Sequence, residues 1–169
     1  DLQTMTLRDH VSLPGQPTRL VLQPDERLLW VGLTGTEPEE NAAEIIDTVH
    51  DKAVARIPLP AGYHEIVFSG DGRHAFISNR QSQSLTIIDA TTFKVMREVD
   101  LGFEPISLMF ADTSALLWVV DAKAGKIHRF DVKGHAVDHW MLEPGLGPIK
   151  LTPDGRYALV VNPSQHLIH

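Results

Sequence analysis

Nine histidines stand out among the 169 residues, because imidazole binds metal ions and haem iron and exchanges protons near neutral pH. They are His10, His50, His64, His74, His128, His135, His139, His166 and His169. His135 and His139 have a spacing of four, which would place both rings on one face of a helix. On a β-strand the same two residues would lie about 13 Å apart and could not share an ion. Their chemistry therefore depends on the secondary structure.

A second group of candidate ligands is acidic. The stretch TGTEPEENAAE carries Glu37, Glu39, Glu40 and Glu44. Ca²⁺ takes six to eight oxygen ligands, but the spaced pattern of acids, amides and glycine that builds a calcium loop is missing here. We interpret the stretch as a solvated acidic loop and predict no metal site. With no cysteine in the chain, thiolate metal sites, disulfides and a cysteine nucleophile are excluded.

His64 is the histidine with the most suggestive neighbours. It follows Tyr63 and precedes Glu65, a carboxylate that could orient its ring. Such an imidazole could act as a general base or as an axial ligand of haem. The sequence contains no G-x-S-x-G elbow, HExxH helix or phosphate-binding loop to support a particular hydrolase.

The elements that would position these residues form a repeat. Asp47, Asp89 and Asp131 each close an apolar run and recur every 42 residues (47, 89, 131). Each unit contains four short runs rich in Val, Ile, Phe and Trp, which indicate β-strands. In the second unit these runs are 65–68, 74–78, 85–88 and 94–101. Four strands in a unit of about 42 residues predict an all-β propeller built from four-stranded antiparallel blades.

The turns and core positions fit this prediction. In SGDGR and TPDGR, Gly72 and Gly155 can adopt the positive φ of a tight hairpin, so the first and second strands of a blade should pair antiparallel. The second strands are apolar on both faces, as expected between two blades. Trp30, Phe76 and Trp118 occupy matching positions there, and we predict that they are core residues.

The repeated pattern resembles the YVTN-type repeats of bacterial β-propellers. It is clearest in SGDGR, FISN and LTIIDATTFKVMREVDLG of the second unit and in TPDGRYALVVN of the last, whereas Leu33 stands where the second unit has Asn79. Such blades also occur in proteins that resemble 6-phosphogluconolactonase, in haem-carrying domains of periplasmic nitrite reductases and in quinoprotein dehydrogenase subunits. The resemblance implies the fold and, as an expectation, a periplasmic or extracellular location; it transfers no active-site residue.

We expect one domain, residues 1–169, with units at 17–62, 63–104, 105–147 and a last unit made of 1–16 plus 148–169. In this arrangement an N-terminal outer strand completes the last blade and closes a four-blade ring. The alternative is part of a larger seven- or eight-blade ring, completed by a second copy as a homodimer or by the remainder of a longer chain.

Propeller ligands commonly sit over the central channel, where the chain crosses from one blade to the next. The residues that we expect at this rim are Arg19, Tyr63, His64, Glu65, Glu104 and Lys150. A net charge of −7 argues against nucleic acid as a partner, and no apolar run is long enough to span a membrane. No signal peptide is recognisable at the N-terminus.

These observations favour a non-catalytic binding or scaffolding module that takes a protein or a small molecule at the rim. One alternative is a haem- or quinone-associated redox propeller with His64 as the iron ligand. Another is a lactonase-like hydrolase with His64 or Glu65 as general base and Arg19 or Lys150 beside the developing oxyanion. The sequence itself requires no cofactor.

Overall fold

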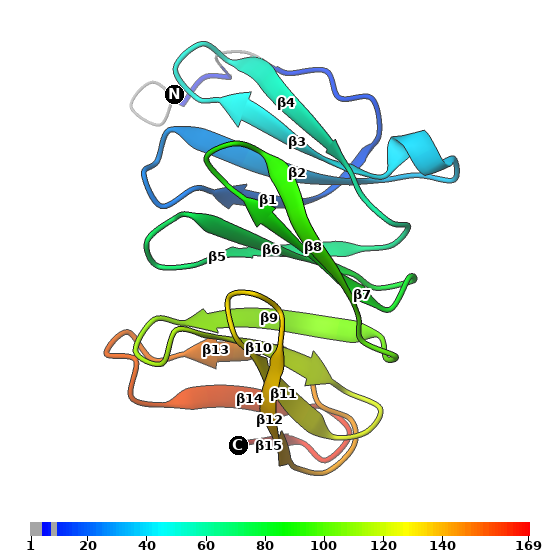
Figure 1. Cartoon of the computed structure of the whole chain (residues 1–169), viewed down its shortest axis with the longest axis vertical. Coiled ribbons are helices and arrows are strands. Elements are labelled where there is room, and N and C mark those ends of the chain that lie inside the picture. The colour runs from blue at the N-terminus through cyan, green and yellow to red at the C-terminus, as the bar shows by residue number, and fades with distance from the viewer. Residues whose placement is uncertain (1–4, 8–9) are drawn as a thin grey trace.

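The computed structural model describes residues 5–7 and 10–169, and nearly all of its regular structure is β-strand (Figure 1). The first sheet contains β1 (Gln16–Leu22), β2 (Leu28–Thr34), β3 (Ala42–Asp47) and β4 (Lys52–Pro58), with a short 3-10 helix, η1 (Pro38–Glu40), before β3. The second contains β5 (His64–Phe68), β6 (His74–Asn79), β7 (Ser84–Asp89) and β8 (Lys94–Asp100). The third contains β9 (Pro105–Ala111), β10 (Leu116–Asp121), β11 (Lys126–Phe130) and β12 (Ala136–Met141), and the fourth contains β13 (Ile149–Leu151), β14 (Ala158–Asn162) and β15 (Leu167–Ile168).

Every sheet is an antiparallel meander in which neighbours in sequence are neighbours in space. Figure 1 shows the four sheets side by side in chain order, with the first at one end of the molecule and the fourth at the other. The first strands β1, β5, β9 and β13 contact one another in succession, as the inner strands of adjacent propeller blades do. The predicted all-β fold of propeller blades is therefore confirmed.

The hairpin turns have the predicted chemistry. Gly72 has φ +68°, and the Oδ1 atom of Asp71 accepts a hydrogen bond from the backbone N–H of Arg73 at 3.0 Å. The last blade repeats this turn with Gly155 at φ +67°. Because these glycines lack a side chain, the tight reversal carries no steric penalty and fixes the register between the first and second strands.

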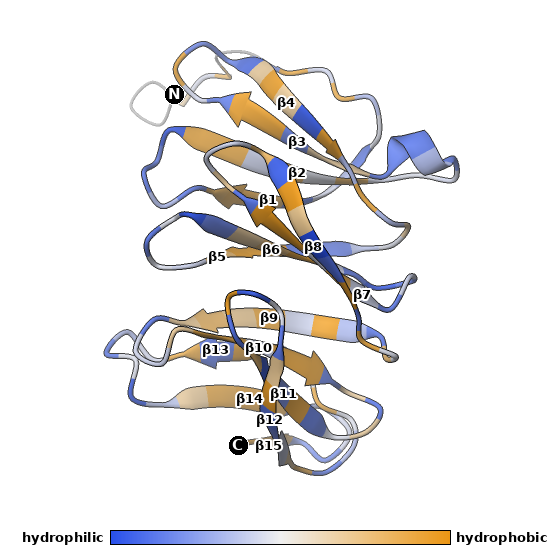
Figure 2. Ribbon diagram, in the orientation of Figure 1, coloured by the Kyte–Doolittle hydropathy of each residue, from blue (hydrophilic) through white to orange (hydrophobic). Residues whose placement is uncertain are grey.

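The core lies between the blades rather than inside any one of them. Trp30 of the first blade packs with Ile66 and Ile77 of the second, and Phe76 of the second packs with Leu117 and Val119 of the third. Figure 2 shows apolar residues concentrated on the middle strands of the blades. Trp30, Phe76 and Trp118 are all buried, as predicted, whereas Trp140 on the outer strand β12 is half-exposed and meets Trp118 edge-on at 4.6 Å.

The inner strands are also joined across the blades by a repeated hydrogen bond. The Glu65 carboxylate of β5 accepts the backbone N–H of Leu108 in β9 at 2.8 Å. One blade later, the hydroxyl of Ser107 accepts the N–H of Ile149 at 3.4 Å. These side chains satisfy N–H groups that β9 and β13 would otherwise leave unpaired.

The ends of the chain bear on the two expected arrangements, a closed four-blade ring and part of a larger ring. Residues 1–4 and 8–9 of the expected closing strand lie outside the described residues, and residues 5–7 and 10–15 form no strand. Leu13 instead packs against Val31, Leu33 and Ile46 of the first blade. The fourth sheet has three strands in the described part of the chain, and Leu159, Leu167 and Ile168 on it are exposed. Leu13 thus packs on the first blade, and residues 5–7 and 10–15 add no strand to the fourth sheet.

Candidate functional site: a cavity between the second, third and fourth blades

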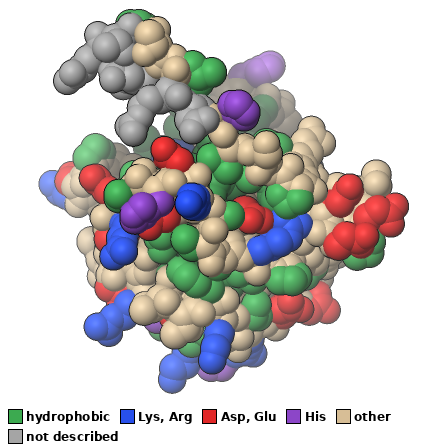
Figure 3. All heavy atoms as spheres, turned by 90° about the horizontal axis from the view of Figure 1, so that it is seen from above, with side chains coloured by type: hydrophobic (Ala, Val, Ile, Leu, Met, Phe, Trp, Pro, Cys, Tyr) green, Lys and Arg blue, Asp and Glu red, His purple; other side chains and the backbone are tan. Residues whose placement is uncertain are grey.

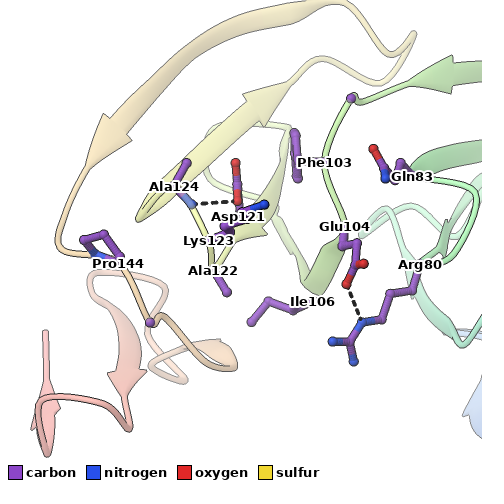
Figure 4. Close-up of a pocket in the computed structure, with 12 residues that line it drawn as sticks. Arg80, Gln83, Phe103, Glu104, Ile106, Asp121, Ala122, Lys123, Ala124 and Pro144 are labelled. Carbon is purple, nitrogen blue, oxygen red and sulfur yellow. Dashed lines mark hydrogen bonds and ion pairs between the residues drawn. The ribbon is translucent and has the colours of Figure 1, made fainter.

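A cavity with a volume of about 830 Å³ lies among the loops of the second and third blades. It is formed by loops between second and third strands together with the crossovers from one blade to the next (Figure 4). Its lining is Arg80, Gln83, Gly102, Phe103, Glu104, Ile106, Asp121, Ala122, Lys123, Ala124, Pro144 and Gly145. A cavity of this size, with an apolar body and a few polar groups, is typical of a small-molecule site.

The charged groups stand on two opposite walls, as Figure 4 shows. On one wall the guanidinium of Arg80 pairs with the carboxylate of Glu104 at 3.4 Å. On the other, the Oδ1 atom of Asp121 accepts the backbone N–H of Ala124 at 3.0 Å. Phe103 and Ile106 supply apolar surface between the walls. The cavity can therefore hold a ligand with an apolar body and polar ends.

His128 lies behind this lining. Its ring stacks on Phe103 with a centroid distance of 4.5 Å, and its Nε2 atom lies 4.0 Å from Oδ2 of Asp121. Nε2 is buried and has no hydrogen-bond partner among the described residues. Burial lowers the pKa of His128; the Asp121 carboxylate opposes this change, and the nearby His139 and Lys126 add to it. His128 is therefore neutral at pH 7.

The expected rim residues are distributed differently. Glu104 lines the cavity, and Lys150 lies exposed on β13. Tyr63 donates a hydrogen bond from its hydroxyl to the carbonyl of Thr18 at 3.1 Å, which ties the first crossover to the first blade. Arg19 is half-buried on β1, and its Nε atom has no hydrogen-bond partner within the described structure. Of the predicted set, only Glu104 belongs to this cavity.

His64 does not reach the channel mouth as expected. Its side chain is 0% exposed, and its Cβ lies against Gly32 of the first blade. Its Nδ1–H donates to the carbonyl of Ser78 at 3.2 Å, and burial lowers the pKa of the ring. Alternation along β5 explains the error: Glu65 faces the third blade, so His64 must face the first.

The other chemical candidates serve local structure. Glu44 pairs with Arg56 at 2.8 Å, and the Glu40 carboxylate accepts the backbone N–H of Glu37 at 3.2 Å. Figure 3 shows the acidic side chains gathered at the side of the molecule where η1 lies. His139 is on strand β12, whereas His135 precedes it and pairs with Asp131 at 3.0 Å. No group of three or more His, Cys, Asp or Glu placed to hold a metal occurs among the described residues.

Sequence reasoning missed Asp121 and Phe103, which line the cavity. A signal was present for Asp121: it closes β10 at the position where β6 ends in Asn79 and β14 ends in Asn162. A second cavity, of about 490 Å³, is bordered by the turns between first and second strands and includes Asp71, His74 and Phe110.

Comparisons with known proteins agree with this fold. No family model matches the chain. The sequence is 28% identical to 6-phosphogluconolactonase of Enterobacter sp. (strain 638) over 94% of this chain and 51% of that protein. It is 27% identical to protein NirF of Pseudomonas aeruginosa over 51% of this chain and 21% of NirF. The chain thus spans about half the length of the lactonase and less of NirF.

Solved structures give the same picture. Hydrazine synthase of Kuenenia stuttgartiensis superposes with a TM-score of 0.74 and 17% identity, over 92% of this chain and 44% of that one. The dihydro-heme d1 dehydrogenase NirN, in complex with DHE, superposes with a TM-score of 0.71 and 19% identity, over 94% of this chain and 38% of that one. No helix in the described part of the chain has the length and apolar character of a membrane span. The repeats, the four sheets and these structural similarities agree on a β-propeller fold, and the sequence is similar at low identity to proteins of the YVTN/NirF-like β-propeller type.

Proposed function

We propose that this protein is a ligand-binding propeller module and that the 830 Å³ cavity holds a small molecule. The observation that carries the proposal is the composition of the lining. Loops of the second and third blades, with the crossovers that follow them, surround Phe103 and Ile106 with two acidic and two basic side chains. Loops on a rigid scaffold are where propellers and other repeat folds place their binding groups.

A filling substitution tests this proposal. Ala122→Trp places an indole in the cavity, whereas Ala136→Trp places the same group on the exposed outer strand β12. A library of small metabolites is screened against the unaltered chain by ligand-observed NMR. We expect hits that Ala122→Trp abolishes and Ala136→Trp retains. Hits that survive Ala122→Trp would place the binding site elsewhere and refute the assignment of the cavity.

For location and partners we propose a periplasmic or extracellular protein whose four blades are half of a larger ring. The similarity to NirF and NirN supports the first part. Two observations support the larger ring. Leu159, Leu167 and Ile168 on the last blade are apolar and exposed. The lactonase relative is also about twice as long as this chain. The acidic net charge gives no electrostatic attraction for nucleic acid.

The similarity to NirN makes a haem-associated redox propeller the first alternative. The residues of the cavity do not fit haem held through its iron, because no His, Met, Cys or Tyr is among its described lining residues. His64, the ligand expected from the sequence, is buried between two blades. Titration of the chain with haem tests the alternative; a Soret band that shifts on binding and is lost in His64→Ala would support it against this geometry.

The similarity to 6-phosphogluconolactonase over 94% of the chain makes lactone hydrolysis the second alternative. His64 is buried and the Glu65 carboxylate already accepts a backbone hydrogen bond, so neither is available as the general base. Asp121 and Glu104 are the carboxylates that line the cavity, and Glu104 is paired with Arg80, which leaves Asp121 as the candidate base. If turnover of a phosphorylated sugar lactone is detected and Asp121→Asn abolishes it, this alternative replaces the non-catalytic role.

A further inference from the structure

Asp121 stands out when the blades are superimposed by their strand register. The equivalent residues Asn79 and Asn162 are fully buried and form structural hydrogen bonds. The Nδ2 atom of Asn79 donates to the hydroxyl of Thr86 at 2.9 Å. In the second blade, Asn79 pairs with Ser84 and Thr86 pairs with Ile77. In the third blade, Asp121 pairs with Lys126 and His128 pairs with Val119, so Asp121 and His128 occupy the positions of Asn79 and Thr86. A neutral hydrogen-bonded pair is thus replaced by an acid and an imidazole.

In the third and last blades, one side-chain oxygen at this position accepts a backbone N–H of the turn that follows. In the last blade, Oδ1 of Asn162 accepts the N–H of Gln165 at 3.3 Å, and in the third blade Oδ1 of Asp121 accepts the N–H of Ala124 at 3.0 Å. The second oxygen of Asp121, Oδ2, accepts no hydrogen bond within the described residues and has His128 at 4.0 Å as its nearest basic group. Asp121 is 7% exposed, and that exposure opens into the cavity.

A carboxylate oxygen that accepts no hydrogen bond from the protein is free to accept one from a ligand, and a charge-assisted hydrogen bond in a partly enclosed cavity is stronger than one between neutral groups. The charges around it favour a cation. Arg80 is neutralised by Glu104, His128 is uncharged at pH 7, and the side chain of Lys123 is exposed to solvent. Lys126, opposite Asp121 on β11, forms no ion pair with it within the described structure. The net charge of −7 also attracts cations at long range.

We infer that Asp121 is the recognition carboxylate of the cavity and that it binds the ammonium group of a ligand whose apolar or aromatic body packs against Phe103 and Ile106. This inference rests on the proposed binding function and names the chemical class of its ligand. His128 does not touch the ligand, because its Nε2 atom is buried; it is a positioning residue that controls how much charge Asp121 presents.

The role of His128 gives the site a pH dependence. The charged and titratable groups around its ring are Asp121 on β10, Lys126 on its own strand and His139 on β12, whose ring centroid lies 5.9 Å away. When the pH falls and His128 gains a proton, the imidazolium competes with the ligand for Asp121. Binding of an ammonium ligand should therefore weaken as the pH falls. By the same linkage, binding of the ligand should favour loss of the proton from His128.

Three probes with one aromatic body test the inference: benzylamine, benzyl alcohol and benzoate. Their binding to the unaltered chain and to Asp121→Asn is followed by amide chemical-shift titration at neutral pH. Asp121→Asn restores the residue that two other blades carry, so the fold is expected to persist. We expect benzylamine to bind about fivefold to tenfold more tightly than benzyl alcohol, benzoate to bind most weakly, and Asp121→Asn to remove the preference.

A second variant separates His128 from Asp121. In the unaltered chain the affinity for benzylamine should fall several-fold between about pH 8 and about pH 5, whereas in His128→Asn it should stay nearly constant. Equal binding of benzoate and benzylamine at the cavity would overturn the inference and leave the binding function standing. If none of the probes shifts an amide of the cavity, both the inference and the proposed cavity are refuted.

Discussion

Glu65 should hold the second and third blades together, and removing its carboxylate should cost measurable stability. Its Oε2 atom accepts the N–H of Leu108 at 2.8 Å, and the Leu108 residue is buried. A hydrogen bond to a charged acceptor contributes about 1.5–3 kcal/mol, and without Glu65 the N–H of Leu108 would stay buried and unpaired. We expect Glu65→Ala to lower the free energy of unfolding by about 2 kcal/mol, which for a chain of this size lowers Tm by about 4–8 °C.

Thermal denaturation followed by circular dichroism, at one fixed protein concentration, measures this effect. Glu65→Gln keeps an acceptor oxygen but loses its charge, so it should lie between Glu65→Ala and the unaltered chain. Glu98→Ala on the outer strand β8 removes an exposed carboxylate that has no hydrogen-bond or ion-pair partner among residues 5–7 and 10–169, and it serves as the matched control. If Glu65→Ala and Glu98→Ala melt together, the hydrogen bond between the blades contributes nothing, and the repeated contact does not stabilise the ring.

Three further predictions follow from the geometry. Gly125 has φ +67°, and a Cβ there would lie 2.7 Å from the carbonyl oxygen of Leu142, so Gly125→Ala should destabilise the chain by about 1–3 kcal/mol and perturb the cavity amides in an NMR spectrum. Burial lowers the pKa of His64, so the ring binds a proton more readily in the unfolded chain than in the folded one. The free energy of unfolding should therefore fall as the pH drops below about 6.5, the ordinary pKa of histidine in an unfolded chain. Urea denaturation at a series of pH values should show a shallower fall for His64→Phe. Light scattering across a range of concentrations should give a mass of two chains if the exposed face of Leu159, Leu167 and Ile168 meets a second copy; a monomer of 18.8 kDa at every concentration would leave completion of the ring to a longer chain.

The fold was predictable because its determinants are local and repeated. The 42-residue interval, the turn at Gly72 and the two-faced apolar strand around Trp30 each depend on a few adjacent residues. The apolar strand recurs in every blade, and the glycine turn recurs in the last. Closure of the ring was not predictable in this way. Alignment of the first residues with an outer strand shows which strand they resemble. It does not show where they pack, because the position of Leu13 on the first blade depends on contacts with residues that are distant in sequence.

The same distinction explains the site. His64 was a plausible rim residue by its place in the repeat, but its direction depends on the register of β5, and the alternation along that strand turns it into the core. The cavity is lined by loops and crossovers of the second and third blades, so no single stretch of sequence contains it. Asp121 alone carried a usable signal, because it breaks the series of strand-ending asparagines.

The position of the cavity has a physical cause in one crossover. Phe103 and Glu104 are adjacent in sequence, yet Phe103 stacks on His128 of the third blade while Glu104 pairs with Arg80 of the second. At the preceding crossover, Tyr63 instead bonds back to Thr18 of the first blade, and the buried His64 fills the space beside Gly32. The side chains of Phe103 and Glu104 turn toward different blades and leave room for the cavity. At the preceding crossover, Tyr63 and His64 both turn toward the first blade and fill the space. His128 therefore supports the wall formed by Phe103 and faces the carboxylate of Asp121, so a change in its protonation reaches both the apolar and the charged parts of the cavity.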